Sequence, residues 1–199
     1  MHKLFVLYIF CLFLVPLTAQ VAEQYDIVIN EIMEDPTITG ENTLGLPAIE
    51  YVELYNRSDK TIDLADFIFT DGPKSAIFPA YQLLPKSYLI IGKTTADALA
   101  DFGIFLGLPN FPTLNGEEEL VLKNEFGETI DVVKYTQGWY GNSSIAGGGY
   151  ALERINPNTP CLGAINWRGA TSFLGGTPGT QHSIFDLGAD LPVNLIDAY

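Results

Sequence analysis

The sequence contains few of the residues that most often carry enzyme chemistry. Its 199 residues include only two histidines and two cysteines. So few imidazoles and thiols argue against imidazole-based catalysis and against metal sites built from several histidines. Basic residues are also scarce, with 10 Lys and Arg against 24 Asp and Glu, and the formal net charge is −14. Because binding to a phosphate backbone needs a basic surface, this balance argues against nucleic acid as a partner.

Residues 1–19 predict a cleaved export signal. Lys3 precedes an apolar run, Pro16 follows that run, and the segment ends at the small residue Ala19. The run is shorter than the roughly 20 residues that a membrane-spanning helix needs. We therefore expect cleavage after Ala19 and no membrane span in the mature chain. The expected final location is the periplasm, the cell surface or the medium.

Removal of residues 1–19 would leave Cys161 and His182 as the only members of their residue types. One cysteine cannot form an internal disulfide, so the exported domain must be stabilised by its core. Hydrophobic residues make up 47% of the chain, which is enough for such a core and excludes a disordered chain. We interpret Cys161 as a small buried side chain and not as a reactive thiol.

Short apolar runs separated by turn residues predict an all-β domain with about eight or nine strands. The runs lie at 26–33, 49–56, 61–64, 66–70, 76–78, 88–92, 119–123, 129–135 and 150–155. We expect the runs 119–123 and 129–135 to pair as a hairpin, and one short helix over 94–102. The loop over 103–115 is expected to pack across an open end of the sheets. Many short strands without alternating long helices indicate an antiparallel β-sandwich, with a barrel as the second choice.

The predicted organisation has three parts. Residues 1–19 are the signal peptide, and residues 20–184 form one β-sandwich domain. Residues 185–199 fit either a terminal tail or a linker that enters a following module beyond Tyr199.

Glu31 is the most informative acidic residue, because it stands inside an apolar strand. We expect it to share a face with Ile29 and Met33. A carboxylate that faces the core is costly unless it is paired or hydrogen-bonded. Basic residues are few, so we predict a structural ion pair between Glu31 and either Arg154 or Arg168.

Trp139 and Tyr140 lie in a glycine-flanked turn and are the predicted binding residues, since planar side chains can stack on a ligand. The alternative is that they cover an open end of the sandwich. Glu50 and Glu53 are expected on opposite faces of a strand, so they cannot form a carboxylate pair. No residue is assigned as catalytic or as a metal ligand. No cofactor is expected, although a single Ca²⁺ bound by loop carboxylates stays an alternative.

Several ordered motifs support a family resemblance. They are Ile29–Ile32 (INEI), Glu50–Asn56 (EYVELYN), Leu120–Lys123 (LVLK), Gly148–Ile155 (GGYALERI), Asn156–Cys161 (NPNTPC), Asn166–Arg168 (NWR) and Gly175–Gly179 (GGTPG). Together these motifs resemble the lamin tail domain of exported proteins from Bacteroidetes-type bacteria, over roughly residues 25–184. The resemblance implies an immunoglobulin-like β-sandwich and carries no established catalytic residues.

The resemblance predicts an exported, non-catalytic binding or structural module that contacts a protein or a cell-surface polymer. In this family the domain commonly accompanies nucleases and hydrolases, so one alternative is an accessory domain of a larger secreted hydrolase, such as a nuclease or phosphatase. A second alternative is a Ca²⁺-dependent carbohydrate-binding module. A shared fold cannot by itself identify a ligand.

Overall fold

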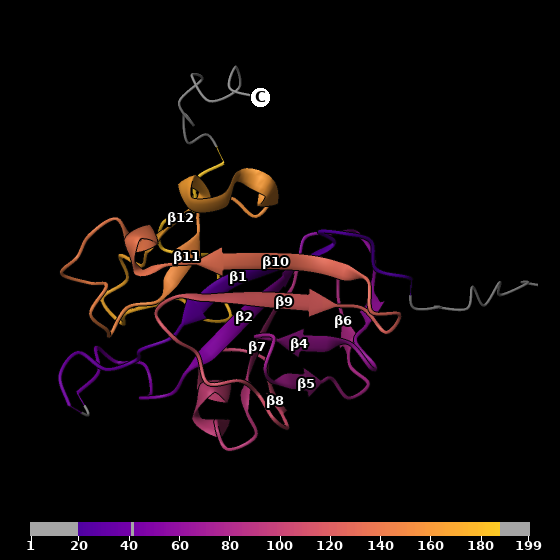
Figure 1. Ribbon diagram of the computed structural model, residues 1–199, viewed down its shortest axis with the longest axis horizontal. Coiled ribbons are helices and arrows are strands. Elements are labelled where there is room, and N and C mark those ends of the chain that lie inside the picture. Colours follow the sequence, from indigo (N-terminus) through magenta and orange to yellow (C-terminus); the bar gives the residue numbers. More distant parts are fainter. Residues whose placement is uncertain (1–19, 41, 188–199) are drawn as a thin grey trace, which may run out of the picture.

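Two β-sheets packed face to face form the domain (Figure 1). The computed structural model describes residues 20–40 and 42–187. The predicted signal peptide, at 1–19, and most of the segment 185–199 lie outside these residues.

The larger sheet has six strands in the order β12, β11, β1, β2, β7, β8. In chain order these strands are β1 (Ile27–Met33), β2 (Tyr51–Asn56), β7 (Tyr88–Lys93), β8 (Phe105–Leu108), β11 (Leu152–Arg154) and β12 (Trp167–Gly169). The second sheet has four strands in the order β10, β9, β4, β5. They are β4 (Ile68–Thr70), β5 (Ser75–Ile77), β9 (Glu118–Lys123) and β10 (Thr129–Tyr135). A further short pair joins β3 (Ile62–Asp63) to β6 (Gln82–Leu83). Figure 1 shows the four-stranded sheet in front of β1, β2 and β7.

The main hydrophobic core lies between the two sheets. Ile29 of β1 and Leu54 of β2 belong to the same buried cluster as Phe69 of β4 and Leu122 of β9. Each of these side chains is fully shielded from solvent, and burying a side chain of this size contributes about 1.5–3 kcal/mol. The alternation of side chains along each strand sends the intervening residues to the outer face of the larger sheet.

The outer face of the larger sheet is also covered. Met33, Tyr51 and Ile90 form a second apolar cluster there, and Leu99 packs against them from the 3₁₀ helix η1 (Asp97–Asp101). Both faces of the sheet are therefore buried, which explains why every residue of β1 is buried.

A β-bulge interrupts β1. The pairing with β2 shifts register between Ile29 and Glu31, so Ile29 and Ile32 face the main core while Glu31 faces the outer layer. The expectation that Glu31 and Ile29 share a face is therefore wrong. The bulge inserts one residue, Asn30, and re-aims the side chain that follows it.

The predicted fold class is confirmed, and each of the nine predicted runs overlaps a strand. The hairpin of β9 and β10 is also confirmed. The sequence did not predict β6, β8 or β12. Because β8 pairs in parallel with β7, the sandwich is not wholly antiparallel, and part of the expected loop 103–115 is an edge strand.

Helical structure in the described part of the chain is limited to three 3₁₀ helices. The helix expected over 94–102 is shorter than predicted and consists of η1 alone. The residue before it, Ala96, provides no side-chain cap. The other two are η2 (Gln137–Tyr140) and η3 (Pro160–Asn166). Within residues 20–40 and 42–187, no helix is both long enough and apolar enough to cross a bilayer.

Candidate functional site

A surface depression at one end of the sandwich, here called the aromatic hollow, has a volume of about 350 Å³. It is lined by residues of β10, η2, β11, η3, β12 and the segment before β1: Tyr25, Val132, Val133, Lys134, Trp139, Arg154, Pro160, Cys161, Gly163 and Trp167. Its size is near the lower end of the range for ligand pockets.

Planar side chains line the aromatic hollow. The ring centroids of Trp139 and Trp167 are 6.2 Å apart, and their planes are tilted by 39°. The Arg154 guanidinium carbon lies 4.7 Å from the centroid of the Trp167 ring, within the range of a cation–π interaction. Trp167 and Arg154 are buried, whereas Trp139 is half-buried and Lys134 is exposed.

Arg154 is fixed by an ion pair between the sheets. Its Nη2 lies 2.9 Å from Asp131 Oδ2, and both side chains are 1% exposed. Its Nε donates to the Ile29 carbonyl at 2.8 Å and its Nη1 to the Pro160 carbonyl at 3.1 Å. Asp131 accepts a second hydrogen bond from the Ile29 amide. Burial raises the pKa of Asp131, and the Arg154 charge opposes that rise.

The predicted ion pair of Glu31 with an arginine is therefore wrong. Arg154 points between the sheets toward Asp131, while Glu31 lies on the outer face. Arg168 is exposed, and its Nη1 donates to the carbonyl of Trp167. The reason is the strand period of two, which sends Glu153 and its neighbour Arg154 to opposite faces.

The structure separates the two predicted binding residues. Trp139 lines the aromatic hollow, but Tyr140 is only 3% exposed and packs in the main core. Trp139 also contacts the core, as the alternative interpretation of a cover over the sandwich expects.

The prediction that Cys161 is buried is wrong, because its side chain is exposed at the rim of the hollow.

A row of three glutamates crosses the outer face of the larger sheet. Glu31 of β1 pairs with Glu153 of β11 on one side and with Glu53 of β2 on the other. Residues directly opposite each other on neighbouring strands have Cβ atoms about 4.5–5.5 Å apart. All three side chains are nevertheless fully buried. We call this row, with Asn30 and His182, the glutamate cluster.

Residues 175–186, here called the strap, cover the glutamate cluster. The amide of Thr177 donates to Glu31 at 3.1 Å, and the amide of Gly179 donates to Glu53 at 2.6 Å. The hydroxyls of Thr177 and Ser183 both donate to Glu153 at 2.8 Å. These donors compensate the buried carboxylates, since hydrogen bonds to a carboxylate are stronger than neutral ones.

The strap approaches the sheet so closely that a glycine is required. A Cβ atom at Gly176 would lie 2.4 Å from Glu31 Oε1 and 2.7 Å from the Tyr51 hydroxyl. That hydroxyl itself donates to Glu31 Oε1 at 2.5 Å. The Gly-Gly-Thr-Pro-Gly motif is thus the segment that docks on the glutamates.

His182 provides the one imidazole of the glutamate cluster. Its Nε2 lies 3.2 Å from Glu53 Oε1 and 3.5 Å from Glu31 Oε2. Burial raises the pKa of Glu31 to about 8, although the nearby His182 opposes the rise. Burial alone would lower the pKa of His182, but the hydrogen bond to Glu53 and the charges of the three glutamates raise it to about 9.

Sequence reasoning recognised Glu31 and missed its neighbours. Glu53 lies between the apolar residues Val52 and Leu54 in a strand that is buried on both faces. An acidic residue between apolar neighbours could have been recognised as a second buried acid. Glu153 and His182 carry no such local signal, because only strand pairing and the path of the strap place them beside Glu31.

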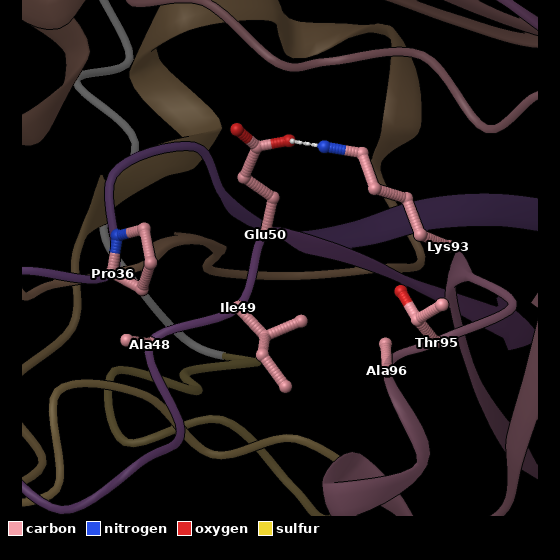
Figure 2. A pocket seen from close by; sticks show the side chains of 7 residues that line it. All are labelled: Pro36, Ala48, Ile49, Glu50, Lys93, Thr95 and Ala96. Carbon is pink, nitrogen blue, oxygen red and sulfur yellow. Dashed lines mark hydrogen bonds and ion pairs between the residues drawn. The ribbon is translucent and has the colours of Figure 1, made fainter.

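A different pocket, of about 280 Å³, lies beside the end of β7 (Figure 2). Figure 2 shows Glu50 and Lys93 pointing toward each other, with Nζ and Oε2 3.1 Å apart. Glu50 also accepts a hydrogen bond from the Leu114 amide. The remaining lining is Pro36, Ala48, Ile49, Thr95 and Ala96, so few polar groups converge there. As expected, Glu50 and Glu53 occupy different sites and do not form a pair.

The two packed sheets define a module of the immunoglobulin-like β-sandwich class. The family model described as Lamin Tail Domain matches residues 20–137, which is more than half of the chain. The chain therefore belongs to the lamin tail domain family, as the motifs indicated. The strap and the Gly148–Ile155 motif lie C-terminal to the matched range. No curated protein matches the sequence.

Proposed function

We propose that this domain is a non-catalytic binding module of an exported protein, and that the aromatic hollow receives an apolar side chain of a protein partner. The observation that carries the proposal is the half-buried Trp139 ring, tilted against the buried Trp167, in an open depression of about 350 Å³. The export signal predicted for residues 1–19 supports action outside the cytoplasm.

The polar groups of the hollow favour an apolar ligand over a sugar. A carbohydrate site needs polar side chains that converge on the ligand beside the stacking ring. Arg154 already donates to Ile29, Pro160 and Asp131. Lys134 is then the charged side chain that the hollow offers, and the half-buried Trp139 supplies the planar contact surface.

A phage-displayed peptide library panned on the wild-type domain tests this proposal, with Trp139→Ala as the comparison. Phe173→Ala is the matched control, since Phe173 is an aromatic residue that is 84% exposed and lies outside the hollow. We expect enriched peptides with aliphatic or aromatic anchors that bind the wild type and the Phe173 variant but not Trp139→Ala.

Two results would contradict the proposal. One is equal peptide binding by Trp139→Ala and the wild type. The other is binding of polysaccharides, but of no peptide, in an affinity electrophoresis panel. That result would favour the alternative of a carbohydrate-binding module. Circular dichroism of each variant checks that the fold is retained.

A further inference from the structure

The glutamate cluster holds more negative charge than its side chains compensate. Glu31, Glu53 and Glu153 are each fully buried. Across residues 20–40 and 42–187, the ion pairs of these three acids involve His182 and no lysine or arginine. Buried carboxylates are normally paired or coordinate metal ions. The excess of carboxylate over cation points to a cationic ligand.

The donor atoms have the spacing of a zinc site. His182 Nε2 lies 3.2 Å from Glu53 Oε1 and 3.5 Å from Glu31 Oε2, and the three donor atoms all lie within 4.8 Å of one another. Bonds of about 2.0–2.1 Å in tetrahedral geometry place neighbouring donors about 3.3–3.4 Å apart. The two separations from His182 already match this spacing, and the two carboxylate oxygens lie within 4.8 Å of each other.

The tautomer of His182 suits a metal ligand. Its Nδ1 lies 2.9 Å from the Arg154 carbonyl, which can only accept, so Nδ1 carries the hydrogen. When Nε2 loses its proton, its lone pair points toward the two carboxylates. A ring N–H donated to a backbone carbonyl is the usual outer-shell contact of a histidine that binds a metal.

Asn30 is an independent observation that points to the same ligand. Its side chain is buried and aimed into the cluster, with Nδ2 2.9 Å from His182 Nε2 and 3.0 Å from Glu53 Oε1, while Oδ1 is buried without a partner. The two amide orientations have the same shape. Turning the amide would place Oδ1 at those distances as a fourth donor, and would move Nδ2 to the position where Oδ1 now has no partner. The metal bonds would then have to outweigh the two hydrogen bonds of Nδ2.

We propose that Glu31, Glu53, His182 and the side-chain oxygen of Asn30 bind a divalent cation of the Zn²⁺ class. One nitrogen and three oxygen donors suit zinc, whereas Ca²⁺ takes six to eight oxygens. Since all four side chains are buried, the site is structural, and the metal fastens the strap to β1 and β2. This site is separate from the aromatic hollow, so its test does not depend on the proposed binding function.

The experiment loads the metal during folding, because the donors are buried. Protein unfolded in denaturant with a chelator is refolded in Zn²⁺, in Ca²⁺ or without metal, and bound metal and the melting temperature are measured. We expect one Zn²⁺ per chain and a raised melting temperature, with no such effect of Ca²⁺. Refolding in Co²⁺ should give the strong visible absorption of tetrahedral coordination.

Three variants decide the outcome. His182→Gln should weaken Zn²⁺ binding by more than the about 10- to 100-fold that outer-shell changes cost. Glu117→Gln is the matched control, since Glu117 is exposed, and should bind like the wild type. Asn30→Asp should bind more tightly, which keeps the test decisive if His182→Gln fails to fold. Wild type and Asn30→Asp that both refold without stoichiometric Zn²⁺ would overturn the proposal, as would equal uptake by His182→Gln.

Discussion

The domain buries two charged clusters on opposite faces of the larger sheet, and they are compensated in different ways. Between the sheets, Arg154 and Asp131 form a one-to-one ion pair that is completed by backbone hydrogen bonds. On the outer face, three glutamates share one imidazole and are compensated mainly by donors of the strap. In the first cluster, the charge of the Asp131 carboxylate is balanced by the charge of Arg154. The second depends on bound protons or a cation, so its stability should respond to pH and to metal.

The largest expected effect on stability comes from breaking the ion pair between Arg154 and Asp131. Arg154→Met removes the cation and leaves the buried carboxylate of Asp131 without its counter-charge, which should reduce the free energy of unfolding by about 3–5 kcal/mol. Urea denaturation followed by circular dichroism measures this loss. Arg168→Met changes an exposed arginine and is the control, with an expected effect within about 0.5 kcal/mol. A loss below about 1 kcal/mol for Arg154→Met would contradict the view that this cluster depends on its ion pair.

The next effect is a loss of stability as the pH rises. The pKa of Glu31 is raised from 4.5 to about 8 and that of His182 from 6.5 to about 9. A raised pKa in the folded state gives stability that is present at low pH and lost as the pH passes the folded value. The metal-free domain should therefore melt at a lower temperature at pH 9.5 than at pH 6.

Differential scanning fluorimetry between pH 5.5 and 9.5 measures this dependence, with about 2–4 °C expected for each kcal/mol lost. His182→Gln removes one of the two titrating groups and should flatten the profile. A melting temperature that rises steadily toward pH 9.5 would refute the prediction for the glutamate cluster.

Glu31→Gln should have a smaller effect at neutral pH, because a pKa of about 8 means that Glu31 is already mostly protonated there. The amide oxygen can still accept from Tyr51 and Thr177. In the metal-free domain we expect a change within about 1 kcal/mol near pH 7, and a gain relative to wild type at pH 9.5. The same unfolding measurement at both pH values checks this sign. A loss of several kcal/mol at pH 9.5 would show that the ionised carboxylate is needed.

The smallest effect concerns the solvent-exposed pair in Figure 2. The side chains of Lys93 and Glu50 are 46% and 21% exposed, so water and salt screen their attraction. Lys93→Met should change the free energy of unfolding by less than about 1 kcal/mol. Urea denaturation at low and high salt measures it, and a loss as large as that of Arg154→Met would remove the distinction between buried and exposed pairs.

The sequence predicted most of the fold because its strands are encoded locally. The β-branched and aromatic runs and their turn residues were enough to locate nine strands. β8 was missed because its residues, Phe-Leu-Gly-Leu, lack alternation and pair in parallel with β7. β6 and β12, which contain two and three residues, were also missed.

The candidate sites were less predictable. Glu31 was correctly marked as a buried acid that needs a partner, but the partner was wrong because the bulge at Asn30 moved Glu31 to the outer face. Trp139 was found from its turn, whereas Trp167 and Arg154 joined it through tertiary packing. Tyr140 could not be separated from Trp139, since neighbours in a 3₁₀ helix point in different directions that only the packing reveals.

The amino-acid order by itself determined the strands, the acidic surface and the need to satisfy a carboxylate inside an apolar run. These are properties of neighbouring residues and of composition. Tertiary structure alone decided that Glu31, Glu53 and Glu153 lie side by side and that His182 caps them. Strand register brings together residues more than a hundred positions apart, and a shift of one position would send each side chain to the opposite face.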